Sequence, residues 1–122
     1  MNTNKILKEL ENLYPGKKIV KNPEDNPTEI LCETEPTEEH ADYSVFVAII
    51  DKTLPHYHEH TKEVYEVAKG TLTVMKGKKE FYLIPGDSLT IIPGEIHSAK
   101  GQETWIKVTS YPGWTKEDHI LI

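Results

Sequence analysis

The segment from His56 to Gly70 concentrates side chains that bind metal ions, with three histidines and three glutamates. Because residues two apart in a strand point to the same face, we expect His56 and His58 to lie side by side, with Cα atoms about 6.6 Å apart. Both imidazoles can reach one ion, since a metal–nitrogen bond is about 2.0–2.1 Å long. Glu63 opens the next extended run and can bring a carboxylate oxygen to the same point.

A second segment, from Pro85 to His97, supplies a further histidine after a strand and a Pro-Gly turn. Either segment alone would be more typical of a surface pair or a simple turn. Together they predict one site with three neutral nitrogens and one carboxylate oxygen. Its predicted ligands are His56, His58, Glu63 and His97.

The two segments resemble the paired motifs of the cupin superfamily. The first motif is a His-x-His pair, about four residues, a Glu, six residues and a Gly. It is matched in full by His56, His58, Glu63 and Gly70. The second motif is a Gly, five residues, a Pro, any residue, a Gly, two residues and a His. Gly86, Gly94 and His97 match it.

Two positions of the second motif depart from the family pattern. Ile92 stands where Pro is usual, with Pro93 one place later, and Gly101 stands where an Asn is often found. Neither departure changes a ligand, so both concern the turns rather than the metal site. The resemblance implies a double-stranded β-helix, the jelly roll or cupin barrel, with the metal inside one open end.

The spacing of apolar residues around the motifs predicts an all-β fold with one short N-terminal helix. Apolar side chains recur at helical spacing over residues 4–14, and Pro15-Gly16 ends that run. Later runs of β-branched and aromatic residues alternate with Gly and Pro turns, which is typical of a sandwich or barrel. Strands are expected over 17–20, 29–33, 43–51, 64–69, 71–76, 80–84, 88–92 and 103–111.

Length and composition limit the chain to one small domain. Its 122 residues leave no room for a second core. We expect one cupin domain over 1–122, made of a helix and turn (1–16), a β-barrel (17–111) and a C-terminal tail (112–122). The apolar end of the tail suggests docking on the barrel or a dimer contact, and we expect a homodimer.

Charge, hydropathy and cysteine content narrow the expected partners and the expected location of the protein. The net charge of −6 argues against nucleic acid and against an anionic membrane surface. No apolar run approaches the ~20 residues that span a bilayer, and Met1 to Leu13 does not have the pattern of a secretory signal. The single cysteine, Cys32, is compatible with a reducing cytoplasm, which is the expected location.

The predicted ligand set suits a divalent transition metal without choosing among Mn, Fe, Ni, Co, Cu and Zn. An octahedral ion held by four protein ligands keeps two open positions for a small-molecule ligand or substrate. Tyr65 has the strand parity of Glu63 and is the best candidate for a catalytic hydroxyl. His60 is a second catalytic candidate, as a residue at the rim of the site.

Three kinds of function remain open for such a site. The first is an enzyme that acts on a small oxygen-rich metabolite, a sugar or a keto or enol acid, by isomerase- or epimerase-like Lewis-acid chemistry. The second is a metal-dependent dioxygenase. The third is a non-catalytic cupin that binds or senses a small molecule. The ligand set is the same for all three.

Overall fold

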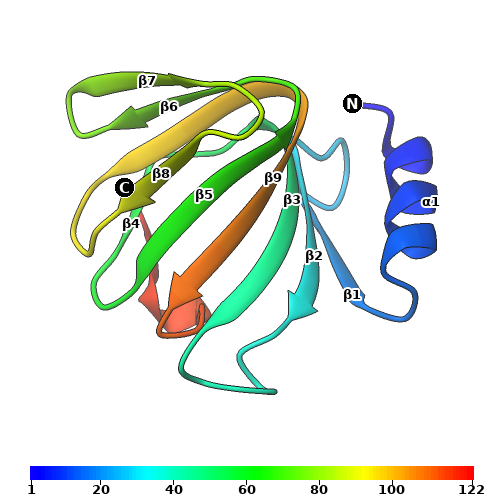
Figure 1. Ribbon diagram of the computed structural model, residues 1–122, viewed down its shortest axis with the longest axis horizontal. Coiled ribbons are helices and arrows are strands. Elements are labelled where there is room, and N and C mark those ends of the chain that lie inside the picture. Colours follow the sequence, from blue (N-terminus) through cyan, green and yellow to red (C-terminus); the bar gives the residue numbers. More distant parts are fainter.

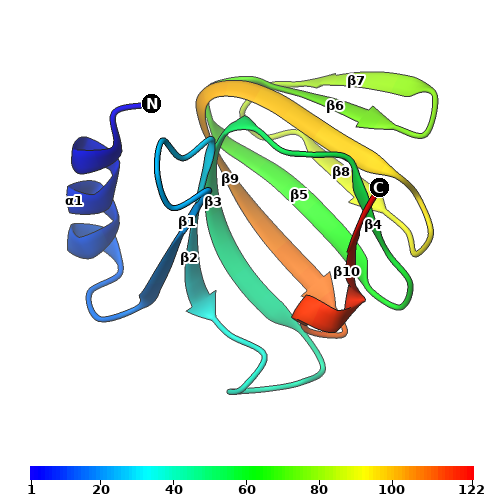
Figure 2. The same ribbon diagram turned by 180° about the vertical axis from the view of Figure 1, so that it is seen from behind.

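The computed structural model describes residues 1–122 as one helix and a ten-stranded sheet that curls into a barrel (Figure 1, Figure 2). This architecture confirms the expected all-β barrel with a short N-terminal helix. The helix is α1 (Thr3–Leu13), and a 3-10 turn, η1, spans Lys116–Asp118. The strands are β1 (Lys18–Asn22), β2 (Glu29–Glu35), β3 (Ser44–Lys52), β4 (His56–His58), β5 (Lys62–Lys69), β6 (Leu72–Lys76), β7 (Lys79–Leu83), β8 (Ser88–Ile91), β9 (His97–Tyr111) and β10 (His119–Leu121).

Helix α1 covers the outside of the barrel beside β1 and β2 (Figure 1). The Asn2 side chain caps its first turn by accepting a hydrogen bond from the Lys5 N–H at 3.3 Å. Ile6 and Leu10 are buried along one stripe of the helix. They pack with apolar side chains from the outer faces of β2 and β3. Because a helix this short is marginal by itself, this contact stabilises it.

Strand β9 closes the barrel because it pairs with strands on both sides of it. The first part of β9 pairs with β6 and β4, and the later part pairs with β3 and β5. The sequence predicted only 103–111 as a strand and placed His97 directly after a turn, outside any strand. In the structure β9 begins at His97 and bends near Glu103, where φ is +49° and the backbone N–H donates to Asp51 Oδ1 at 2.7 Å.

Strand β3 separates two apolar clusters, as the alternation of side chains in a strand requires. Ala48 and Ile50 point into the barrel, whereas Val47 and Ile49 point toward α1. Trp105 also packs in the outer cluster. The inner cluster packs inside the barrel, and one of its members, Tyr65, lies next to His97. Burial of each of these large aliphatic side chains contributes about 1.5–3 kcal/mol.

The C-terminal residues form an element that the sequence did not predict as a strand. After η1, strand β10 pairs antiparallel with β4, so that His119 lies opposite His58 and Leu121 opposite His56. The backbone of the C-terminal segment therefore pairs with its own barrel, at the edge of the sheet that carries two predicted metal ligands, while the side chains of Leu121 and Ile122 are exposed. Figure 2 shows β10 running beside β4.

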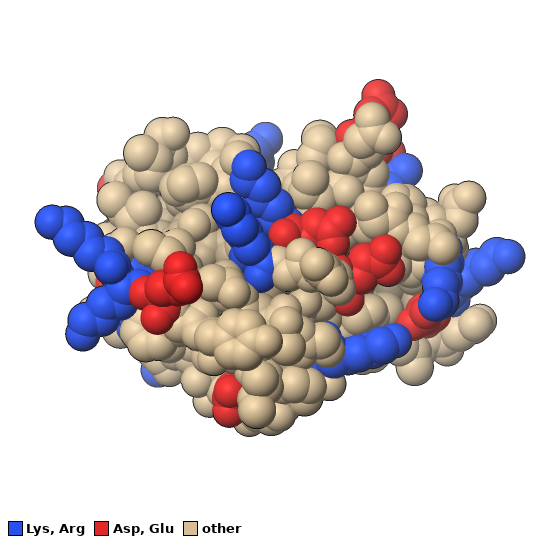
Figure 3. Space-filling view, turned by 90° about the horizontal axis from the view of Figure 1, so that it is seen from above, with Lys and Arg blue, Asp and Glu red and all other residues tan.

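The surface carries both signs of charge. On the face shown in Figure 3, Lys side chains alternate with Asp and Glu over short distances. The absence of a nucleic-acid partner stays a prediction. No helix combines the length and the apolar character needed to cross a bilayer.

Candidate metal centre

The four predicted ligands converge inside one end of the barrel. His56 and His58 come from β4, Glu63 from the start of β5 and His97 from the start of β9. All four are buried, with exposed fractions between 2% and 6%. One ligand atom from each lies within 4.8 Å of the others. Pairing of His56 with His97 across β4 and β9 brings the two motifs into direct contact.

Backbone carbonyls orient two of the imidazoles. His56 Nδ1 donates to the Leu54 carbonyl oxygen at 2.8 Å, and His97 Nδ1 donates to the Glu95 carbonyl oxygen at 2.9 Å. In its neutral form each ring therefore carries its proton on Nδ1, so that Nε2 is the nitrogen available to a metal ion. Hydrogen bonds of this kind fix the tautomer and orientation of metal-ligating histidines.

The Glu63 carboxylate lies at the centre of the group. Its Oε1 atom is 3.2 Å from His97 Nε2 and 3.2 Å from His58 Nε2. Burial alone would raise the pKa of Glu63, but the His58 and His97 imidazoles hold this pKa well below its usual range. Burial lowers the pKa of His56 to about 4, and the neighbouring His97 adds to this effect. Glu63 is therefore ionised and His56 neutral at physiological pH, as metal binding requires.

The donor set fits a divalent transition metal. Neither ring nitrogen of His58 has a hydrogen-bond partner although both are buried, and the contact with Glu63 lacks hydrogen-bond geometry. Buried polar atoms are rarely left unpaired, and a metal ion would satisfy His58 Nε2. Two atoms bound to one ion at about 2.1 Å are at most ~4.2 Å apart. The four donor atoms are already close to that limit and need only a small contraction.

The two predicted catalytic residues lie in different environments. Tyr65 is 5% exposed in the inner cluster, and its ring centroid is 6.2 Å from that of His97. Burial and the Glu63 carboxylate raise the pKa of Tyr65 well above its usual value, so its hydroxyl stays protonated. The His60 side chain is 78% exposed on the turn between β4 and β5, with Nε2 3.8 Å from Glu59 Oε2. A catalytic role for either residue stays a prediction.

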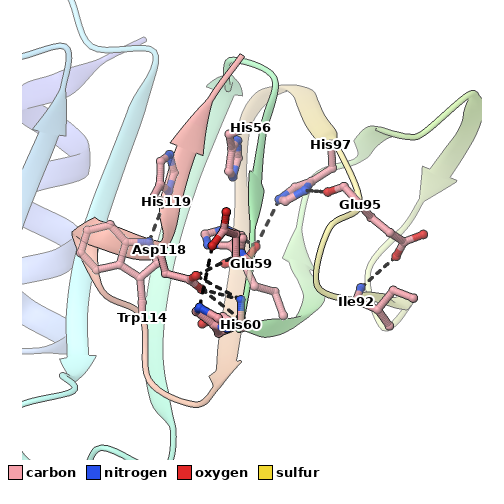
Figure 4. A network of polar contacts seen from close by, with 12 residues as sticks. His56, Glu59, His60, Ile92, Glu95, His97, Trp114, Asp118 and His119 are labelled. Atoms are coloured by element: carbon pink, nitrogen blue, oxygen red, sulfur yellow. Dashed lines mark hydrogen bonds and ion pairs between the residues drawn. The ribbon is translucent and has the colours of Figure 1, made fainter.

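Asp118 organises the turn that joins two of the ligands, and no sequence pattern predicted this role. Its Oδ1 accepts hydrogen bonds from the backbone N–H groups of Glu59 and His60, both at 3.0 Å. Its Oδ2 accepts one from the Thr61 N–H at 3.0 Å. Burial opposes ionisation of Asp118, but Thr61 and these N–H groups lower its pKa. Figure 4 shows this carboxylate below His56 and His119, with dashed lines to the turn that carries Glu59 and His60.

His119 is a fourth imidazole beside the centre. It projects from β10 and stacks on His56, with ring centroids 4.3 Å apart and planes inclined by 13°. Trp114 Nε1 donates a hydrogen bond to His119 Nδ1 at 3.3 Å. Figure 4 shows His97, His56 and His119 as a row, with Trp114 beneath the last of them. The only sequence signal for His119 is its alternation with Leu121 in a run too short to predict a strand.

Comparison with known proteins identifies the fold. No family model matches the sequence, and no curated protein matches it. Among solved structures, the chain is similar to Pac13, a nucleoside dehydratase, with 12% identity over 78% of each chain and a TM-score of 0.71. It is similar to KdgF from Halomonas sp., with 19% identity over 78% of this chain and 88% of that one and a TM-score of 0.66.

A third similar structure is a sugar phosphate isomerase of the cupin superfamily from Silicibacter pomeroyi. Its identity is 18%, over 69% of this chain and 59% of that one, with a TM-score of 0.58. The chain has the cupin fold. The paired motifs seen in the sequence therefore occupy neighbouring strands of a cupin barrel, and their ligands form one buried group.

The cupin centre would have a small net positive charge with a divalent ion bound. Three neutral imidazoles and one carboxylate leave a formal charge near +1. All 14 residues of the Lys and Arg class are lysines, and none is buried. The barrel therefore offers no cationic side chain to a ligand in its interior, and the ion itself would be the only positive charge there.

Proposed function

We propose that the protein is a metal-dependent enzyme that acts on a small oxygen-rich metabolite, a sugar or a keto or enol acid, by isomerase- or epimerase-like chemistry. The observation that carries the proposal is the buried group of three histidines and one glutamate at the open end of a cupin barrel. A divalent ion held there would act as a Lewis acid toward adjacent hydroxyl and carbonyl oxygens.

Different residues around the ion would bind the metal, donate a hydrogen bond to the substrate and exchange protons with solvent. His56, His58, Glu63 and His97 would hold the metal. Tyr65 Oη has no protein hydrogen-bond partner and remains protonated, which suits it to donate a hydrogen bond to a substrate oxygen. His60 stays a predicted rim residue, able to exchange protons with solvent from its exposed position.

The lack of buried lysine and arginine narrows the substrate class. Phosphate groups in proteins are usually held by Arg, Lys or a helix N-terminus, and the interior of this barrel has none of these. A neutral or singly charged metabolite fits better than a phosphorylated one. Two structures of the same fold are described as a nucleoside dehydratase and a sugar phosphate isomerase, which supports sugar-containing substrates as a class.

Metal analysis and a turnover screen test the proposal together. Protein purified without a His-tag or added metal should contain close to one transition-metal ion per chain. His97→Ala should lose most of it while keeping the β-sheet circular dichroism spectrum. A screen of sugars and sugar-derived acids, run with zinc in air and under nitrogen, should find turnover that does not require oxygen.

Other outcomes of the screen would indicate one of the two alternative functions, a dioxygenase or a non-catalytic binding protein. Turnover only with iron and only in air would replace the proposal by a dioxygenase. Saturable binding of a metabolite without turnover would indicate a binding or sensor cupin. Metal content that survives both His58→Ala and His97→Ala would overturn the ligand assignment itself.

A further inference from the structure

Strand β10 places a fourth histidine against the metal centre without adding it to the ligand group. His119 lies opposite His58 in the register of β10 and β4, so both side chains are on the same face of the sheet. The ring centroid of His119 is 4.3 Å from that of His56 and 5.2 Å from that of His58. Its nitrogens nevertheless fall outside the set of ligand atoms that lie within 4.8 Å of one another.

Trp114 determines which nitrogen of His119 carries the proton. An indole N–H can only donate a hydrogen bond, so His119 Nδ1 must be the acceptor in the 3.3 Å contact between them. The neutral His119 ring therefore has its proton on Nε2. This is the opposite of the neutral tautomer expected for His56 and His97, whose Nδ1 atoms donate to carbonyl oxygens.

The Nε2–H group of His119 has no protein acceptor. The only hydrogen bond of this ring is the one from Trp114, and the ring is half-buried rather than sealed in the core. Its position is fixed from two sides, by stacking on His56 and by the neighbouring Asp118, which binds the turn between β4 and β5. A rigid donor without a partner, next to a centre that would bind oxygen ligands, is suited to recognise one.

We propose that His119 Nε2–H donates a hydrogen bond to the ligand of the metal centre, and that this donor favours a monoanionic carboxylate with a neighbouring hydroxyl or carbonyl oxygen. The proposal rests on the proposed metal-dependent function and specifies the ligand class for it. A monoanion would neutralise the formal charge of about +1 left by a divalent ion and Glu63. No buried lysine competes with the ion or with His119 for that charge.

Ligand binding to the cobalt-loaded protein tests the role of His119 without measuring turnover. The probes are glycolate, which has a carboxylate next to a hydroxyl, and imidazole, which has no acceptor once it binds an ion. Both are titrated against the visible absorption of Co²⁺. The variant His119→Phe keeps a ring stacked on His56 but removes the donor. We expect its cobalt content to equal that of the wild type, its glycolate Kd to rise about 10-fold, and its imidazole Kd to stay within twofold.

Two further variants separate the donor from the shape of the side chain. His119→Gln keeps an N–H donor near the position of Nε2 and should recover most of the glycolate affinity. Trp114→Phe removes the indole donor and frees the tautomer, so its glycolate Kd should rise by about threefold while cobalt content is unchanged. If His119→Phe destabilises the protein, the glycolate affinities of Trp114→Phe and His119→Gln still compare a displaced donor with a retained one.

The results that overturn the proposal are distinct from those that overturn the metal centre. An unchanged glycolate Kd in His119→Phe removes the donor role, and lost cobalt in that variant makes His119 a ligand instead. Cobalt-loaded wild-type protein that does not bind glycolate overturns the carboxylate class. Wild-type protein that binds no cobalt overturns the proposed function, and this inference with it.

Discussion

The Asp118 carboxylate accepts a hydrogen bond from the backbone N–H of Thr61 at 3.0 Å across 57 positions of sequence. The same carboxylate binds the N–H groups of Glu59 and His60. It therefore occupies the turn between ligands His58 and Glu63 much as a capping residue occupies the first turn of a helix. The position of the metal ligands thus depends on the C-terminal segment as well as on the two motifs.

Replacement of Asp118 by Ala should weaken both the fold and the metal site. The N–H groups of the turn would lose a charged acceptor, and we expect the free energy of unfolding to fall by about 2–4 kcal/mol. Metal affinity should fall about 10-fold or more, as it does when partners of ligating residues are removed. Urea unfolding of the metal-free protein and a competitive metal titration measure the two effects.

Asp87→Ala is the matched control, because Asp87 accepts a hydrogen bond from the Ile84 N–H at 3.0 Å in an exposed turn. It should cost under about 1 kcal/mol and leave metal affinity unchanged. The Asp118 effect also has a defined pH dependence. Its folded pKa lies below the unfolded value of about 3.9, so its contribution is complete above that value and disappears as pH falls through the folded pKa. A difference between wild type and Asp118→Ala that persists at pH 2 would contradict this account.

Gly70 should tolerate alanine less well than the other glycines with a positive φ. Its φ is +86°, and a Cβ there would lie 3.2 Å from Thr104 Oγ1. Alanine would add crowding to the cost of about 1–2 kcal/mol for a left-handed backbone. Thr104 Oγ1 is itself fixed by a hydrogen bond to the Thr71 carbonyl oxygen. Thermal unfolding of Gly70→Ala should show a loss of about 2–3 kcal/mol in total.

Gly77→Ala separates these two costs. Gly77 has a φ of +60°, but a Cβ there would meet nothing within 4 Å. This variant should show only the backbone cost, about 1 kcal/mol. Equal losses at Gly70 and Gly77 would mean that the close approach to Thr104 has no energetic consequence.

The metal ligands could be predicted from the sequence because each half of the site is encoded locally. His56 and His58 share a face by strand alternation alone, and the motif spacing leads to Glu63 and His97. The strands around them could be predicted for the same reason, since turns and alternating residues mark them individually. The short N-terminal helix could also be predicted, from the helical spacing of its apolar residues, and in the structure that stripe packs on the outside of the sheet.

The rest of the site depends on contacts between distant parts of the chain, which a local pattern does not record. Asp118 and His119 reach the centre only because β10 pairs with β4, and a three-residue strand has too little alternation to be recognised. The start of β9 was missed for a related reason. Gly101 looks like a turn residue in the sequence. In the structure it lies inside β9, at the end of the part that pairs with β6.

Glu29 should make stability fall as pH rises, in contrast to Asp118. It lies opposite Ile50, a member of the inner cluster, and so faces the interior of the barrel. Burial raises its pKa to about 7, and the Glu63 carboxylate adds to this rise. In the unfolded chain the pKa is about 4.3. Folding therefore takes up a proton between these values, and the free energy of unfolding decreases as pH rises from about 5 to 8.

Glu29→Gln removes the charge that must be buried at high pH. Relative to wild type, the variant should gain about 1–3 kcal/mol at pH 8 and change little at pH 5. Urea unfolding of metal-free protein at the two pH values measures this difference. Glu66→Gln, on the exposed face of β5, is the control and should give the same small change at both values. A Glu29→Gln variant that is no more stable at pH 8 than at pH 5, relative to wild type, would show that the Glu29 carboxylate stays hydrated in the folded protein.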